Sequence, residues 1–417
     1  MLHYVLPGRS WMSKIDRNDF FRYKNLFKNE RMPLAFVDLE KFDSNVTYVS
    51  STQKNTDKTI RVGTKSIRSV DLTQRVFLKG GPVYKGILGF TMEEAAFLAS
   101  KGFDDIIVAY PTVQPADISL FVELVKEKKR ISLVIDSVEH LRILSAAGEK
   151  AGVILSACME VDMAYRPLKS SLHIGIRRSP IRTIAQALDL ARASQNLKGV
   201  KIDSLMGYEG HIAGLRDAVP GKWLTNALLY LLKRVSMREL TLRRDGIVQA
   251  LQKEGLKLNV INGGGSGSLI HSGKDPDLTE VTAGSAFYCS GLFHDFRDVE
   301  FTPSAFFAVQ VVRKPAPGMV TCLGGGYVAS GAIGADRLPL PVLPAGIKLL
   351  PLEGAGEVQT PLIIPSDCPP LNLGDPVFFQ HAKAGELCER FDELYLVEGE
   401  RIVKKVKTYR GEGKSFL

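Results

Sequence analysis

Eight short apolar runs, mostly separated by segments with helical periodicity, recur between residues 60 and 284 and constrain the fold more than any other feature. Strands that are apolar along their length and alternate with helices indicate a parallel sheet covered by helices. One intervening segment, "TMEEAAFLASKG", opens with the capping pair Thr91 and Glu94. The runs are Ile60–Thr64, Gly86–Phe90, Asp105–Tyr110, Ile131–Asp136, Gly152–Asp162, Ile202–Tyr208, Leu256–Ile261 and Thr279–Gly284.

Eight such units predict an α/β fold, namely an eight-stranded parallel (β/α)8 TIM barrel, with an open doubly wound sheet as the structural alternative. After about residue 296, Pro and Gly become dense and short β-like runs such as "AFFAVQVV" and "DPVFF" replace the helical pattern. This change predicts a C-terminal antiparallel β domain. The expected domains are a barrel over residues 32–296 and a β domain over 297–417 joined by part of 1–31. The stretch 34–45 should form a strand that leads into a helix.

Composition excludes several classes of protein. The chain of 417 residues is 45% hydrophobic and 24% charged, which is ordinary for a globular protein. The net charge is +9, but the basic residues are scattered and no nucleic-acid motif accompanies them, so we expect an anionic small molecule and no nucleic acid. Five cysteines without a CxxC pair, and no signal peptide or membrane span, predict a cytoplasmic protein that is not bound to a membrane.

Polar side chains follow several of the predicted strands. In a barrel these positions share one mouth, where catalytic residues gather. Three consecutive glycines and a serine, in "NGGGSGS" at 262–268, allow close approach of an anion such as phosphate. A lysine in a partly apolar site can form a Schiff base with an aldehyde. Residues at the predicted mouth are Lys65, Asp162, Arg166, Tyr208, Glu209, His211 and Tyr288.

Pyridoxal phosphate carries both an aldehyde and a phosphate, so the lysine and the glycine loop together point to this cofactor. With these motifs in this order, the sequence resembles the fold-type III pyridoxal phosphate enzymes. Within that family it is most similar to the D-threonine aldolase and D-serine dehydratase group, with alanine racemase more distant. The resemblance runs from about residue 34 to the C-terminus and rests on "LAFVDLEKFDSN", "RVGTKS", "GYEGH", "NGGGSGS" and "LGDPVFFQHAKAGELCERFDELYLV".

The resemblance implies a role for each matching residue. Lys65 would carry the Schiff base, and Tyr208 would lie near the pyridine nitrogen of the cofactor. Arg166 would approach the phenolic oxygen, although the spacing around it departs from the family pattern and "HIGIRRSP" offers Arg177 and Arg178 instead. The residues implied in phosphate binding are Gly264, Gly265, Ser266 and Tyr288.

The resemblance also implies a metal, because these aldolases and dehydratases carry a histidine and, two residues later, an aspartate or cysteine. Here His381 matches, but Lys383 stands at the second position. Cys388 or Glu386 could replace the missing ligand; alternatively, the charge of Lys383 substitutes for the metal, or these are ordinary loop residues. The absence of a metal is favoured, since a histidine and a lysine are a poor ligand set.

The expected activity is that of a lyase that cleaves or dehydrates a D-β-hydroxy amino acid such as D-threonine or D-serine. His381 is the candidate base for aldol cleavage, and Lys65 the base for dehydration. The alternatives are an amino-acid racemase, with Tyr327 as the proposed second base, and a non-catalytic pyridoxal phosphate carrier. In this fold the β domain commonly completes the partner's site, so we expect a homodimer. The helix "WLTNALLYLLKRV" is expected to serve packing or a dimer surface.

Overall fold

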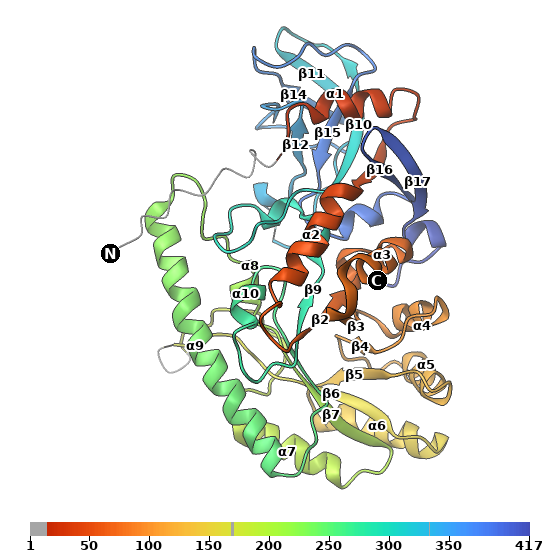
Figure 1. The fold of residues 1–417 in the computed structure, drawn as a ribbon, viewed down its shortest axis with the longest axis vertical. Helices are drawn as coiled ribbons and strands as arrows, with labels where there is room; N and C mark the ends of the chain where they lie inside the picture. Colours follow the sequence, from red (N-terminus) through yellow and green to blue (C-terminus); the bar gives the residue numbers. More distant parts are fainter. Residues whose placement is uncertain (1–14, 168–170, 333) are drawn as a thin grey trace.

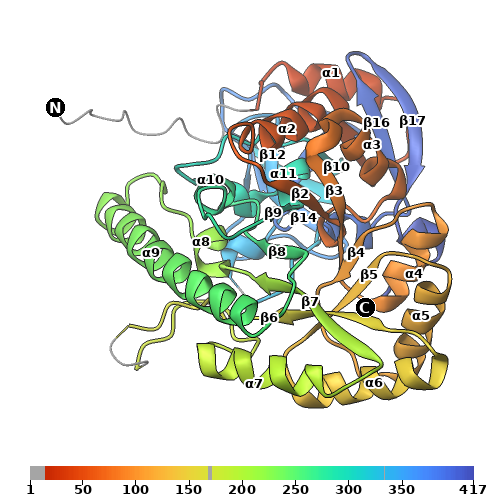
Figure 2. The ribbon, with the colours of Figure 1, turned by 60° about the horizontal axis from the view of Figure 1, so that its bottom comes forward.

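The structure is a computed structural model that describes residues 15–167, 171–332 and 334–417. The barrel lies below the second sheet in Figure 1, and Figure 2 shows its strands from a second direction. Eight strands close the barrel in chain order, and every neighbouring pair is parallel. They are β2 (Thr59–Gly63), β3 (Tyr84–Gly89), β4 (Ile106–Val108), β5 (Ile131–Ile135), β6 (Leu155–Glu160), β7 (Val200–Gly207), β8 (Val260–Gly263) and β9 (Glu280–Ala283).

Both the barrel and the β domain predicted from the sequence are therefore confirmed, and the open doubly wound sheet is excluded. Buried β-branched and other apolar residues build the strands; all five residues of β5, "ISLVI", are buried. A compact apolar cluster of Ile107, Val134, Cys158 and Met206, contributed by four successive strands, packs inside the barrel.

Amphipathic helices surround the barrel and bury their apolar sides against it. Thr91 caps α4 by accepting a hydrogen bond from the Glu94 N–H at 3.1 Å. The Glu94 carboxylate accepts instead from the Phe90 N–H at 2.7 Å, so the reciprocal half of the predicted capping box is displaced by one residue. The helices that follow the barrel strands are α3 (Val70–Gly80), α4 (Met92–Ser100), α5 (Pro115–Lys126), α6 (Val138–Ala151), α7 (Ile184–Gln195), α8 (Gly210–Gly214), α9 (Trp223–Lys253), α10 (Leu269–Ser272) and α11 (Ser285–Tyr288).

The second sheet has nine strands and draws on both ends of the chain. Its strands are β1 (Leu34–Asp38), β10 (Ala305–Arg313), β11 (Met319–Leu323), β12 (Leu340–Leu343), β13 (Lys348–Leu349), β14 (Gln359–Ile363), β15 (Pro376–Gln380), β16 (Glu393–Glu398) and β17 (Arg401–Lys407). All pairings are antiparallel except that between β1 and β16.

The strand β1 lies in this second sheet, although a domain boundary at residue 32 would place it with the barrel. It hydrogen-bonds with β10 and β16, and α2 (Leu39–Ser51) then leads the chain from the sheet to the barrel. Aromatic packing explains the placement, because Phe36 stacks on Phe306 of β10 with ring centroids 5.4 Å apart. Tyr23 of α1 (Asp19–Leu26) packs edge-on against Phe36 at 4.7 Å, so α1 covers the same sheet.

Helix α9 runs along the outer edge of the barrel (Figure 1). It spans 31 residues, and a stripe of large apolar side chains on it faces solvent. Among the described residues, no helix combines the length and the apolarity that crossing a membrane requires. The exposed apolar side chains of the helix are Trp223, Leu224, Leu228, Leu231, Val235 and Leu242.

Candidate active site

A cavity opens where the barrel strands end, and residues at or after every barrel strand except β5 line it. Lys65 and Ser66 follow β2, and Tyr110 follows β4. The lining also includes Arg178 from the segment after β6, Tyr208 after β7, and the glycine loop Gly264, Gly265 and Ser266 after β8. The structure therefore brings together Lys65, Tyr208 and the glycine loop, as the sequence predicts, since parallel strands deliver their carboxyl ends to one mouth.

Lys65 sits in the short turn Thr64–Ser66 directly after β2. Its Nζ donates a hydrogen bond to the Tyr110 hydroxyl at 3.3 Å. Its carbonyl oxygen accepts from Nε of Arg68 at 3.0 Å, which fixes the backbone of the turn. The Tyr110 hydroxyl thus positions the lysine amine at the cavity, and Arg68 stabilises the turn that carries the lysine.

The glycine loop is shaped by close contacts. Gly264 has φ +75°, a left-handed conformation that favours glycine. A Cβ on Gly265 would lie 2.9 Å from Cε2 of Tyr208, so only glycine leaves room for that ring. The Gly264 N–H donates to Glu209 at 3.0 Å and the Gly265 N–H to Ser268 at 3.0 Å. These two amides are committed inside the protein, and Oγ of Ser266 accepts from the N–H groups of Gly284 and Ala286 at 3.2 and 3.0 Å, so the loop is also anchored to the segment after β9.

Arg178 is the arginine of this cavity. Its guanidinium carbon lies 5.2 Å from the ring centroid of Tyr110 and 5.3 Å from that of Tyr208, at cation–π distance of both rings. Nη1 pairs with Glu160 at 3.7 Å. Burial raises the pKa of Glu160 to about 7 despite the attraction of Arg178. An arginine from "HIGIRRSP" therefore occupies the place for which the resemblance offered Arg166 first.

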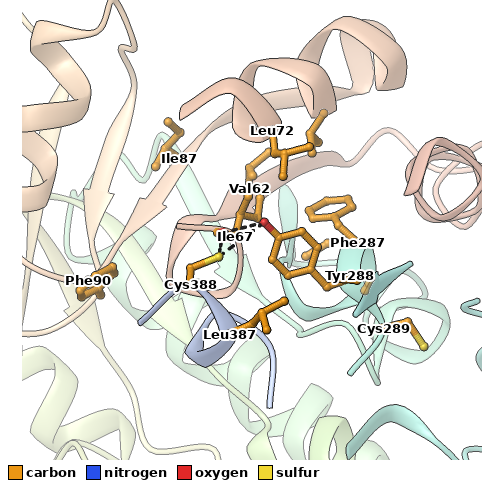
Figure 3. Packing of buried hydrophobic residues seen from close by; sticks show 14 of the residues in the cluster. Val62, Ile67, Leu72, Ile87, Phe90, Phe287, Tyr288, Cys289, Leu387 and Cys388 are labelled. Atoms are coloured by element: carbon orange, nitrogen blue, oxygen red, sulfur yellow. Dashed lines mark hydrogen bonds between the residues drawn. The ribbon is translucent and has the colours of Figure 1, made fainter. Parts of the chain in front are cut away.

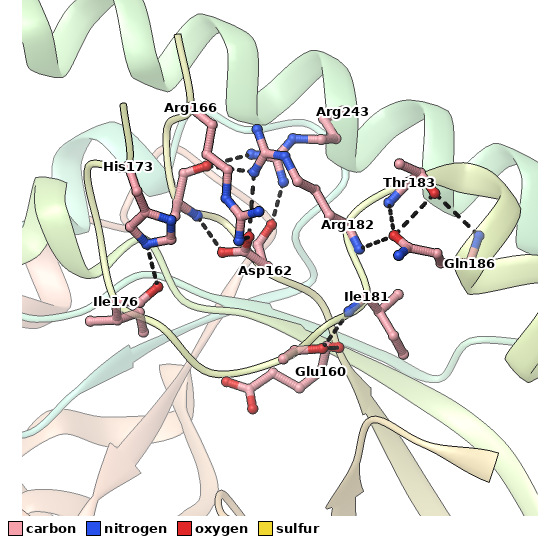
Figure 4. A network of polar contacts seen from close by, with 12 residues as sticks. Glu160, Asp162, Arg166, His173, Ile176, Ile181, Arg182, Thr183, Gln186 and Arg243 are labelled. Atoms are coloured by element: carbon pink, nitrogen blue, oxygen red, sulfur yellow. Dashed lines mark hydrogen bonds and ion pairs between the residues drawn. The ribbon is translucent and has the colours of Figure 1, made fainter. Parts of the chain in front are cut away.

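Arg166 does not line the cavity of Lys65, and its contact with the cofactor's phenolic oxygen stays a prediction. It pairs with Asp162 at 2.6 Å in a polar network above β6 (Figure 4). Arg182 and Arg243 join this network, donating to the carbonyl oxygens of Ala164 and Asp162.

Tyr288 also does not line this cavity, and its role in phosphate binding stays a prediction. The ring is fully buried, and its hydroxyl donates to the carbonyl oxygen of Ile67 at 2.8 Å (Figure 3). Cys388 donates to the same carbonyl at 3.2 Å, and burial raises the pKa of its thiol to about 12. Tyr288 of α11 and Cys388 of the β domain thus contact the same backbone carbonyl, next to the turn that follows β2.

His381 and Lys383 line a second cavity of about 540 Å³, together with Arg68, Tyr327 and Glu386. None of the described residues lines both cavities. Burial lowers the pKa of His381 to about 4, and neither ring nitrogen meets hydrogen-bond geometry with a described residue. Nζ of Lys383 donates to Ser330 at 2.6 Å and pairs with Glu386 at 3.2 Å. Of the site residues predicted from the sequence, Lys65, Tyr208 and the glycine loop thus line the first cavity, whereas His381 and Lys383 line the second.

A family model for the alanine racemase N-terminal domain matches residues 37–290. This chain belongs to that family. The family resemblance inferred from the motifs is therefore confirmed, and membership implies pyridoxal phosphate as cofactor.

Curated relatives of this alanine racemase-domain protein include a D-threonine aldolase of Arthrobacter sp. It is 25% identical over 291 residues, which cover 69% of this chain and 70% of the relative. A 3-hydroxy-D-aspartate aldolase of Paracoccus denitrificans (strain Pd 1222) is 23% identical over 64% of this chain and 63% of its own length, so the match spans less than two thirds of that relative.

Solved structures show the same fold over nearly the whole chain. D-threonine aldolase from Filomicrobium marinum superposes with a TM-score of 0.78 at 18% identity, covering 91% of this chain and 96% of the other. D-threo-3-hydroxyaspartate dehydratase from Delftia sp. HT23 gives 0.73 at 17% identity, covering 92% and 98%.

The first cavity of this alanine racemase-domain protein fits pyridoxal phosphate. The amine of Lys65 points into it, and Gly265 and Ser266 line its wall with Ser66 and Ser285, which suits a phosphate. A divalent metal does not fit the second cavity. Cys388 is turned away toward Ile67, Lys383 is a cation, and the described residues contain no group of three His, Cys, Asp or Glu side chains that could hold a metal.

Tyr110 was not selected from the sequence as a functional residue. It is the last residue of the apolar run "DIIVAY", so its position at the end of a barrel strand was visible. This position indicated that Tyr110 could reach the site, since side chains at the carboxyl ends of barrel strands face the mouth.

Proposed function

We propose that this protein is a pyridoxal phosphate-dependent lyase that acts on D-configured β-hydroxy amino acids, by aldol cleavage or by dehydration. The observation that carries the proposal is the single cavity holding Lys65 and the glycine loop in a member of this family. The curated relatives are named for aldol cleavage of D-threonine and of 3-hydroxy-D-aspartate, and one structural neighbour is named a dehydratase.

The bound cofactor supplies an electron sink that weakens the bonds to the substrate α-carbon. Lys65 would hold the cofactor by its aldehyde end, and the loop at Ser266 its phosphate. Arg178 and Tyr208 form the wall beside the space for the ring. In dehydration, the Lys65 amine would take the α-proton, and the resulting ammonium would return a proton to the departing β-hydroxyl, which leaves as water. In cleavage, the β-hydroxyl would lose its proton as the Cα–Cβ bond breaks, and a proton returned to Cα would complete glycine beside the aldehyde.

The base for aldol cleavage stays a prediction. His381 is neutral above pH 4, as a base must be, but it lines the other cavity. Tyr327, the proposed second base of a racemase, lines that same cavity and not the one of Lys65. Within one chain, this separation applies equally to the cleavage base and to the racemase base, so product analysis has to distinguish the two functions.

The test is product analysis with matched enantiomers. D-threonine, D-threo-3-hydroxyaspartate and D-serine are incubated with the purified protein and pyridoxal phosphate, beside their L-forms. We expect either glycine with an aldehyde, or a keto acid with ammonia, from the D-substrates alone. Racemised amino acid would favour the racemase, and cofactor binding without turnover of any substrate would favour a carrier.

The homodimer likewise stays a proposal, and the exposed apolar stripe of α9 supports it as a surface that a second copy could cover. Light scattering at micromolar concentration tests it: twice the mass of one chain is expected, and a monomer with full activity would contradict the proposal.

A further inference from the structure

Tyr110 stands out among the residues of the first cavity because its hydroxyl contacts the Lys65 amine directly. The two residues follow barrel strands separated by β3, and the Nζ–Oη distance is 3.3 Å. The Lys65 ammonium also lies 5.9 Å from the centroid of the Tyr110 ring. The proposed function uses Lys65 as a base. A hydroxyl that hydrogen-bonds to its amine can therefore affect every step in which the amine gains or loses a proton.

The charges around the Tyr110 ring favour the loss of its proton. Lys65 approaches from the turn after β2 and Arg178 from the segment after β6, while Glu160 of β6 opposes them as the paired anion of Arg178. Burial raises the pKa of Tyr110, but the attraction of Lys65 and Arg178 outweighs it and the net change is a lowered pKa.

Tyr208 offers an internal comparison. It lines the same cavity and lies at cation–π distance of the same guanidinium, yet burial raises its pKa. Tyr110 and Tyr208 therefore shift in opposite directions beside the same guanidinium. The difference follows from the hydrogen bond with Lys65, which among the described residues Tyr110 makes and Tyr208 does not.

We propose that Tyr110 is a second acid–base residue of this site, which exchanges a proton with Lys65 across their hydrogen bond. One proton moves from Nζ of the Lys65 ammonium to the Tyr110 phenolate oxygen, leaving a free amine and a neutral phenol, and the reverse step returns it. No other bond changes and no electron is transferred. Ordinary pKa values of Tyr and Lys, about 10 and 10.4, are close enough for the proton to pass in either direction.

This inference rests on the proposed function, because a lyase needs the Lys65 amine in its deprotonated form before the amine can take an α-proton. It makes Tyr110 a positioning residue that acts through Lys65. Arg178 supports the exchange by stabilising the phenolate state. The aromatic ring of Tyr110 also contacts Arg178. A mutation that removes only the hydroxyl therefore distinguishes the role of the hydroxyl from that of the ring.

The experiment is an ultraviolet titration of tyrosinate in the full-length protein, before and after loading with pyridoxal phosphate. The wild type should show one tyrosine ionising below the others. Tyr110→Phe, which keeps the ring beside Arg178, should remove that step. Lys65→Met should move it to higher pH by about one unit, because the neighbouring charge is gone. Tyr208→Phe is the matched control and should leave the step in place.

Turnover of the D-substrate separates the two proposals. If the wild type turns over a D-β-hydroxy amino acid, Tyr110→Phe should lower kcat by about tenfold to a hundredfold and alter the pH profile, and an unaltered profile would overturn the inference. If the wild type shows no turnover, the proposed function fails, while the tyrosinate titration still tests the pair. The inference is overturned in either case if the tyrosine ionisation at the lowest pH is still present in Tyr110→Phe, or if its pH is unchanged in Lys65→Met.

Discussion

Arg61 of β2 and Glu280 of β9 form a buried ion pair across the seam where the barrel closes. Nη2 of Arg61 lies 2.9 Å from Oε2 of Glu280, and their side chains are 1% and 4% exposed. Asn262 of β8 donates to the same carboxylate at 2.7 Å. The pair therefore joins the first and last strands of the barrel below the cavity of Lys65.

Replacing Glu280 by Ala should lower the free energy of unfolding by about 3–5 kcal/mol, because it leaves the buried Arg61 charge without its main partner. Chemical denaturation measures the change. Lys404→Ala is the control, since it breaks an ion pair with Asp71 whose side chains are 60% and 38% exposed, and should cost about 1 kcal/mol or less. Equal losses in the two variants would contradict the assigned role of the seam pair.

Gly265→Ala should weaken the binding of pyridoxal phosphate by about tenfold or more, equivalent to 1.4 kcal/mol. The new Cβ would meet the Tyr208 ring at 2.9 Å and push it into the cavity. Fluorescence or absorbance titration with the cofactor measures the affinity. Gly214→Ala serves as control, because a Cβ there meets no atom within 4 Å. Unchanged affinity in Gly265→Ala would show that the ring is not part of the site.

The barrel could be predicted from the sequence because each strand is a local apolar run. The end of each run also indicated which side chains reach the mouth, and Lys65, Tyr208 and Gly264–Ser266 do line one cavity. Arg166 and Tyr288 do not line that cavity, because Asp162 pairs with Arg166 and the carbonyl of Ile67, distant in the sequence, accepts a hydrogen bond from Tyr288. The pairing of β1 with β10 is a long-range contact that no local pattern encodes.

His381 should make stability depend on pH between about 4 and 6.5. Its pKa is about 4 in the folded protein and 6.5 when unfolded, so the unfolded state binds the proton first as the pH falls. The stability from neutral His381 is therefore present above pH 6.5 and is lost toward pH 4, by up to about 3 kcal/mol. The free energy of unfolding of the wild type, measured by denaturation at each pH, should fall relative to that of His381→Leu as the pH falls through this window. Parallel curves would mean that the imidazole is solvated.

Exhaustive chelation should leave the activity intact. Lys383 and Glu386 pair with each other beside His381, and the described residues hold no cluster that suits a divalent cation. Activity after treatment with a strong chelator, with elemental analysis of the same sample, gives the answer. Loss of activity that zinc or manganese restores would show that a metal site is present despite Lys383, and that the charge of Lys383 does not replace the metal.

Covalent labelling of Lys65 tests the central claim most directly. Protein incubated with pyridoxal phosphate is reduced with borohydride, digested and analysed by mass spectrometry, with Lys65→Ala treated in parallel. We predict one cofactor per chain on the peptide that contains Lys65, and a near-ultraviolet to visible absorbance band that Lys65→Ala lacks and Ser266→Ala retains at lower occupancy. A protein that takes up no cofactor, or that carries the label on another lysine, would contradict the account.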